Sequence, residues 1–154
     1  ISSRIRTDLF VQLGAADPDA RRVKMSPGLF RRALGAAVTR EVGACLGLAD
    51  NFAGSCCVPV DSLRSPSYTQ RYGLSASIMD QLPYNMVARP GDKERGVALI
   101  HTAPGVYDEY AVDWLYRPVA GAGTPEEEIP ELDRRIAVRR GDPMWGFDRR
   151  DETK

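Results

Sequence analysis

The sequence predicts a mainly α fold with little or no sheet. Three stretches of the chain carry helical periodicity or helix-end signals, and the segments between them are rich in Gly, Pro and Ser, which favour turns. With 154 residues, of which 43% are hydrophobic, the chain is long enough for one domain with its own core.

The charge balance excludes some kinds of partner. The 21 Lys and Arg residues equal the 21 Asp and Glu residues, so no global field attracts nucleic acid or an anionic membrane.

No apolar run approaches the roughly 20 residues that span a bilayer. Residues 1–10 lack the apolar core of a signal peptide, and the chain starts at Ile1 rather than Met. We therefore expect no nucleic-acid binding and no membrane span, and a chain that is a processed product or a piece of a longer one.

The clearest helix signal covers residues 27–46. Ser26 can cap this helix, Pro27 suits its first position, and Gly47 is a natural stop. Apolar residues recur close to the 3.6-residue period, at Phe30, Leu34, Ala37, Val38, Val42, Cys45 and Leu46.

The other elements are predicted from shorter signals. Besides 27–46, helices are predicted at 4–16, within 65–73, within 105–118, where the helix is rich in aromatic residues, and at 131–140, where it is the third main helix. The chain between these helices is predicted as a turn at 17–22, irregular chain at 51–67, turn and loop at 76–92 and a flexible acidic loop at 120–130. A polar tail follows at 141–154. In the tail, Met144, Trp145 and Phe147 are expected to pin the chain to a neighbouring surface.

Cysteine and histidine are too scarce for a disulfide framework or an ordinary zinc site. Cys45 could bridge to Cys56 or Cys57, but buried free thiols are the favoured interpretation. The chain has one histidine, His101, which we expect in a loop or at the surface, whereas imidazole zinc sites use two or three.

Three ordered blocks of the sequence are informative together: "EVGACLGLADNF" (41–52), the segment at 58–92 with "SIMD", and "GVYDEYAVDWLYRP" (105–118). They resemble a bacterial family of metzincin-type zinc peptidases known as Met-zincin or EcxA-like. "EVGACLGLADNF" (41–52) is similar to the family's "EVGHTLGLRHNF". The segment at 58–92, which contains "SIMD", resembles the family's following segment with its Met-turn, and 105–118 resembles its next helix. The resemblance covers residues 27–118.

The resemblance implies which residues occupy the active-site positions. In metzincins two histidines four residues apart on a helix bind zinc, a glutamate after the first is the general base, and a third ligand follows a glycine turn. Laid on this pattern, Glu41 and Gly47 match, whereas Arg40, Ala44 and Asp50 stand at the three former ligand positions. No metal is expected, because alanine has no ligand atom and arginine is a fixed cation.

The resemblance also implies a metzincin-like C-terminal half, with the active-site helix at 27–46 and a Met-turn at Met79. Residues 1–118 would form this degenerate domain, and residues 119–154 a linker, short helix and tail. Gln81 replaces the family's aromatic residue after the Met-turn, and the 26 residues before the helix leave no room for the family's N-terminal sheet.

Two hypotheses for the site remain open from the sequence. Arg40 either takes the place of the missing cation, by pairing with Asp50, Glu41 or both, or it points to solvent. A makeshift metal site from Glu41, Cys45, Asp50 and His101 is the disfavoured third possibility.

The favoured function is a catalytically inactive metzincin-like module, a pseudo-peptidase that binds a protein partner or belongs to a larger assembly. The alternative is a zinc-dependent metalloendopeptidase, active through an unorthodox site or as part of a longer chain. The resemblance favours an exported or periplasmic protein, although no signal is visible in the chain.

Overall fold

The computed structural model describes residues 2–149 and shows an almost entirely helical chain in that range. Its elements are α1 (Ser2–Leu13), η1 (Pro18–Arg21), α2 (Pro27–Cys45), η2 (Val60–Arg64), α3 (Pro66–Tyr72), α4 (Val106–Tyr116), α5 (Pro125–Ala137) and η3 (Pro143–Trp145), where η marks a 3-10 helix. Within the same residues, the only isolated β-bridge is an antiparallel one between Tyr84 and Ile100. The prediction of a mainly α fold with little or no sheet is confirmed.

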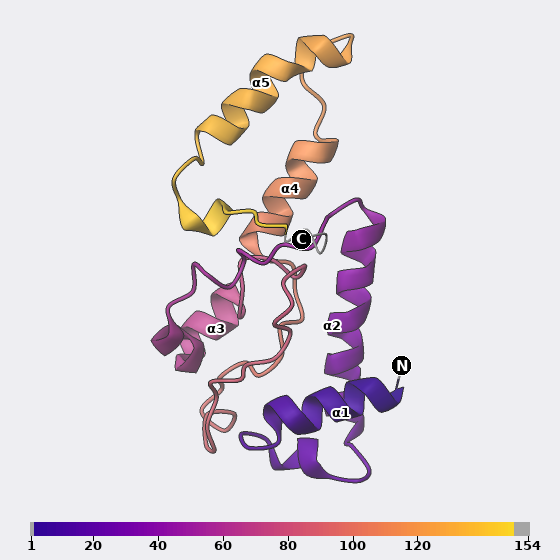
Figure 1. The fold of residues 1–154 in the computed structure, drawn as a ribbon, viewed down its shortest axis with the longest axis vertical. Helices are drawn as coiled ribbons and strands as arrows, with labels where there is room; N and C mark the ends of the chain where they lie inside the picture. The colour runs from indigo at the N-terminus through magenta and orange to yellow at the C-terminus, as the bar shows by residue number, and fades with distance from the viewer. Residues whose placement is uncertain (1, 150–154) are drawn as a thin grey trace, which may run out of the picture.

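The helices are spread along one long axis (Figure 1). α1 lies at one end, across the start of α2, and α5 lies at the opposite end beside α4. The chain between α3 and α4 forms a long loop that runs toward the end of the molecule where α1 lies and then doubles back. The core lies where α1, the first half of α2 and this loop meet, and its largest members are Ile5, Leu9, Leu13, Leu29, Tyr84, Leu99 and Ile100.

The helix-end signals explain the bounds of α2. The Ser26 hydroxyl accepts a hydrogen bond from the Leu29 N–H (3.2 Å), and Pro27 occupies the first turn, where its missing N–H costs nothing. The helix ends one residue earlier than predicted. At this end Leu48 N–H donates to Gly43 O and Gly47 N–H donates to Ala44 O, which is a Schellman motif that requires the left-handed φ of +86° at Gly47.

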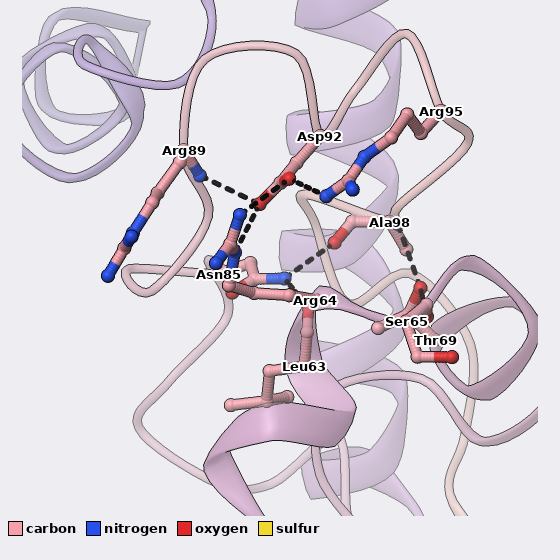
Figure 2. Close-up of polar contacts among 9 residues, drawn as sticks. All are labelled: Leu63, Arg64, Ser65, Thr69, Asn85, Arg89, Asp92, Arg95 and Ala98. Atoms are coloured by element: carbon pink, nitrogen blue, oxygen red, sulfur yellow. Dashed lines mark hydrogen bonds and ion pairs between the residues drawn. The ribbon is translucent and has the colours of Figure 1, made fainter.

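A buried carboxylate anchors the long loop. Asp92, only 1% exposed, accepts two hydrogen bonds from the Arg64 guanidinium (2.8 and 3.2 Å), one from the Arg89 N–H (2.9 Å) and another from Arg95 (Figure 2). The Arg64 guanidinium is the main reason that the pKa of this carboxyl lies far below its usual value. The loop is thereby fastened to η2.

One predicted local structure is wrong and another is more regular than predicted, for reasons of helix capping. The segment 120–130 is not all loop, because α5 begins at Pro125: Thr124 Oγ1 accepts from the Glu127 N–H, and three acids stand in the first turn. The predicted turn at 17–22 contains the 3-10 helix η1, with Asp17 as its cap.

The cysteines are free, as favoured, but the prediction that they are buried is wrong. Cys45 and Cys56 are exposed, and Cys57 is partly buried. The outward face of α2 that carries Cys45 is apolar without being covered: Val38 and Val42 are each 52% exposed. Periodicity alone therefore did not identify which face of α2 points to the core.

The tail packs back onto the body of the chain, as predicted. The Trp145 ring lies edge-on to Tyr110, with ring centroids 5.6 Å apart, and Phe147 stacks on Tyr107 at 6.0 Å. Burial raises the pKa of the Tyr107 hydroxyl to about 12. The buried Asn51 side chain donates to Gly146 O (3.0 Å) and accepts from the Asp148 N–H (3.1 Å).

Candidate functional site

The candidate site lies where the last turns of α2 face the loop at 78–81. Arg40 and Gly43 belong to the side of α2 that is turned toward this loop, one turn apart. The Schellman turn at Gly47 then reverses the chain and brings Asp50 back beside Arg40. Residues ten apart in sequence thus meet because the helix ends where it does.

Arg40 is held by three acceptors. Its Nη2 lies 2.5 Å from Asp50 Oδ1, and its Nη1 donates to the carbonyl oxygens of Ile78 (3.4 Å) and Asp80 (3.2 Å). Gln81 completes the group, because its Nε2 donates to the other Asp50 oxygen at 3.1 Å. We call Arg40, Asp50, Gln81 and the two carbonyls the arginine clasp.

The hypothesis that Arg40 pairs with Asp50 is confirmed, and the alternative that Arg40 points to solvent is wrong. The Arg40 side chain is 27% exposed and that of Asp50 43% exposed. Water therefore reaches the ion pair and screens it, so the pair fixes the position of Arg40 but is weaker than a fully buried ion pair.

Met79 packs directly under α2. It is 3% exposed, and its Sδ would lie 2.8 Å from a Cβ added to Gly43. The loop can approach the helix this closely only because residue 43 is glycine. The Met79 carbonyl also accepts from the Asn51 N–H (3.2 Å), which joins the loop to the chain after α2. Met79 is therefore a buried core residue.

A second buried carboxylate fixes the shape of the loop. Asp108, which is 2% exposed and lies in the first turn of α4, accepts from Ser77 Oγ (2.6 Å), from the Ile78 N–H (2.6 Å) and from the Gly105 N–H (2.7 Å). Because the Ile78 carbonyl is one of the acceptors for Arg40, Asp108 supports the clasp indirectly.

The sequence did not single out Asp108 as a site residue. The one available signal was its place at the third position of a helix, where acids are favoured. The two carbonyls of the clasp carried no signal at all, because every residue has one.

Glu41 and Ala44 take no part in the clasp. Both are exposed on α2, and no hydrogen bond or ion pair is found for the Glu41 side chain within the part of the chain that the structure describes. Glu41 is therefore a solvent-facing carboxylate beside the clasp, rather than a partner of Arg40.

His101 lies elsewhere, in the irregular chain before α4, as the prediction of a loop position has it, but the alternative that it lies at the surface is wrong. It is 4% exposed, and its Nδ1 accepts from the Leu74 N–H (3.1 Å). This contact assigns the proton of the neutral ring to Nε2, for which no partner is found among residues 2–149. Burial lowers the pKa of His101 below its usual value, and the nearby charges of Asp108 and Asp80 oppose that shift.

The side chains at the predicted ligand positions do not fit a zinc ion. A guanidinium repels a cation, alanine offers no donor atom, and the Asp50 carboxylate is already engaged by Arg40 and Gln81. Across residues 2–149, no three His, Cys, Asp or Glu side chains are grouped closely enough to hold a metal ion, so the makeshift site from Cys45 and His101 is not formed.

The helix ended by a glycine turn and the methionine loop packed beneath it are the features that the metzincin resemblance leads one to expect. A family model described as Met-zincin matches residues 22–154, which is most of the chain. The chain therefore belongs to the Met-zincin family. No curated protein and no protein of solved structure matches it. None of the helices in residues 2–149 is long and apolar enough to cross a membrane.

Proposed function

We propose that this chain is a catalytically inactive metzincin-like domain, a pseudo-peptidase that serves as a structural or protein-binding module. The observation that carries the proposal is the arginine clasp. In a zinc peptidase of this kind, a metal cation would join the helix to the residue after the glycine turn. Here the Arg40 guanidinium joins α2, Asp50 and the loop carbonyls.

The chemistry of the site supports loss of catalysis. Zinc lowers the pKa of its bound water from about 15.7 to about 7, which supplies a nucleophile at neutral pH. Arg40 is a cation but has no open coordination position, so it cannot activate a water in this way. Glu41, at the general-base position, then has no activated water to deprotonate.

The alternative is a zinc-dependent metalloendopeptidase completed by residues outside this chain or by an unorthodox site. It is favoured by the family and by the retained Glu41, which stands exposed one residue after Arg40. It requires donors that Arg40 and Ala44 cannot provide.

Two measurements on the same purified protein separate these functions. Elemental analysis after incubation with zinc and desalting should find far less than one zinc per chain, and an unstructured substrate such as casein should remain uncut. One retained zinc per chain together with cleavage that a chelator abolishes would overturn the proposal.

A rebuilt variant provides the positive control. Arg40→His, Ala44→His and Asp50→His together place imidazoles at the three predicted ligand positions. We expect this variant to retain about one zinc, because residues four apart share a face of α2. If it binds no zinc although it folds, the assignment of these three positions is wrong.

A further inference from the structure

The neutral chain is not uniformly neutral. Residues 1–32 contain seven Lys and Arg but only three Asp and Glu, so the remainder of the chain carries the opposite excess of four negative charges. The overall balance that argues against an anionic partner therefore hides a local positive region. In space, this region is α1, the loop after it and the start of α2, at one end of the molecule's longest axis (Figure 1).

Two of the three acids at this end are turned inward. Asp17, with a side chain only 1% exposed, is paired with Lys93 Nζ at 2.7 Å. Asp19, with a side chain 15% exposed, accepts from Ser26 Oγ and lies 3.7 Å from Arg22. Asp19 therefore offsets Arg22 in part, whereas Asp17 is paired with a lysine from outside residues 1–32. The six arginines and the lysine of residues 1–32 are all exposed.

Apolar side chains protrude among these cations. Val23 is 86% exposed, Val11 72% and Phe10 56%. Arg6 Nη1 donates to the Val23 carbonyl (3.2 Å) and thereby holds the loop against α1. Between α1 and the loop lies a groove of about 310 Å³, and its lining includes Arg6, Phe10, Arg21, Arg22 and Val23.

We propose that this surface binds the anionic face of a lipid bilayer. We call it the basic end, and its members are Arg4, Arg6, Phe10, Val11, Arg21, Arg22, Val23 and Lys24. The groove with its three arginines receives phosphate headgroups, and the three protruding apolar side chains reach the headgroup–acyl boundary. The protein then lies on the membrane without crossing it.

The shape of the basic end favours lipid over a folded acidic partner. A protein partner would need a complementary pocket for each isolated, highly exposed valine, whereas a fluid bilayer accepts protruding apolar groups wherever they stand. Nucleic acid uses the same cations but gains little from Val11 and Val23, which carry no stacking surface.

The test is co-sedimentation of the chain with vesicles of phosphatidylcholine alone and of phosphatidylcholine mixed with phosphatidylglycerol. We expect binding to the mixed vesicles only, weakened by added salt. Arg4→Gln/Arg21→Gln/Lys24→Gln removes three cations for which no polar contact is found within residues 2–149, so it should fold normally. It should lower the partition coefficient by about 100-fold, because each of the three cations near an anionic surface contributes roughly fivefold.

The matched control removes the same net charge elsewhere. Arg71, Arg140 and Arg149 are exposed and lie outside the basic end, and their joint replacement by Gln should change binding by less than about twofold. A second variant replaces the three apolar residues: Phe10→Ser/Val11→Ser/Val23→Ser. It should bind the mixed vesicles more weakly, and this binding should still weaken when salt is added.

Several outcomes would overturn the proposal. The first is that the chain does not bind the mixed vesicles at low salt. The second is that the charge variant and its control lose vesicle binding to the same extent. The third is that replacement of the three apolar residues does not change vesicle binding. Binding to polyglutamate or duplex DNA as tight as binding to vesicles would show a general attraction for polyanions and would also overturn the assignment to lipid.

Discussion

At the residue scale, Arg40 gives α2 a cation that makes structural contacts. Its charge and three acceptors make it a structural tie between α2, the chain at Asp50 and the loop at 78–81. The tie is partly open to water, so its contribution to stability is modest.

Replacement of Arg40 by alanine should lower the free energy of unfolding by about 1 kcal/mol, because it removes a screened ion pair and two bonds to carbonyls. For a chain of this size the melting temperature should fall by about 2–4 °C, measured by circular dichroism. Glu41→Ala, one residue along the same helix, is the matched control and should leave the melting temperature within about 1 °C. Equal effects of the two variants would contradict a tie at Arg40.

His101 should make stability depend on pH. Its pKa is lower in the folded chain than in the unfolded chain, so below pH of about 6.5 the unfolded chain binds the proton more readily. The stability due to neutral His101 is therefore complete above pH of about 6.5 and is lost as pH falls. Urea unfolding at a series of pH values between about 5 and 7.5 should show stability rising with pH.

The control for this slope is His101→Asn, whose amide oxygen can still accept from the Leu74 N–H but does not titrate. Because the chain has one histidine, the variant should be nearly flat over the same range. A variant with the slope of the natural chain would show that another group is responsible.

At the scale of elements, buried carboxylates act together with apolar contacts to hold the long loop between α3 and α4. Asp92 fastens the loop before α4 to η2, and Asp108 fixes the turn that contains Met79. Each accepts at least three hydrogen bonds. Loops with so many polar backbone groups need such acceptors when they are drawn into the interior.

Asp108→Asn tests this role with almost no change in volume. An amide presents one oxygen and one donor group, so at least one of the three buried donors loses its acceptor. We expect the free energy of unfolding in urea to fall by about 2–4 kcal/mol. Asp113→Asn, which breaks only the solvent-exposed pair with Arg117 in the same helix, should cost about 0.5 kcal/mol or less. A loss no larger for Asp108 than for Asp113 would contradict the proposed anchor.

Helix positions were predictable where local signals decide them. The start of α2 follows from Ser26 and Pro27, and its end from Gly47. The early start of α5 was missed because Gly, Pro and acids together favoured a loop, although Thr124 and Pro125 form a cap and a first turn.

At the scale of the whole molecule, the tail closes the structure. Besides the two bonds to Asn51, the Phe52 N–H donates to the Asp148 carbonyl (2.9 Å), and Arg139 lies over the rings of Tyr110 and Trp145 at 4.4 and 4.9 Å. The segment after residue 118 is thus in contact with the chain that follows α2. The proposed division into 1–118 and 119–154 can be tested through these contacts.

A chain shortened to residues 1–118 should be less stable than the full chain, because the Asn51 side chain loses its two partners in the tail and the rings of Tyr107 and Tyr110 lose Phe147 and Trp145. We expect the melting temperature to fall by about 5 °C or more. Protease cleavage in the loop at 47–59 should also become faster. An unchanged melting temperature would instead show that residues 1–118 form an independent domain.

The sequence by itself determined the mainly helical fold and, to within one residue, the bounds of α2. These are properties of local capping and of periodicity, and they need no knowledge of distant contacts. The predicted ligand positions Arg40, Ala44 and Asp50 come instead from the family resemblance. Only the tertiary structure decided that Arg40 reaches Asp50 and two loop carbonyls and that His101 is buried. It also decided that the basic residues of the segment 1–32 lie at one end of the molecule's longest axis. The physical reason is that these features depend on which segments pack together across loops, and a single sequence carries no local signal for such packing.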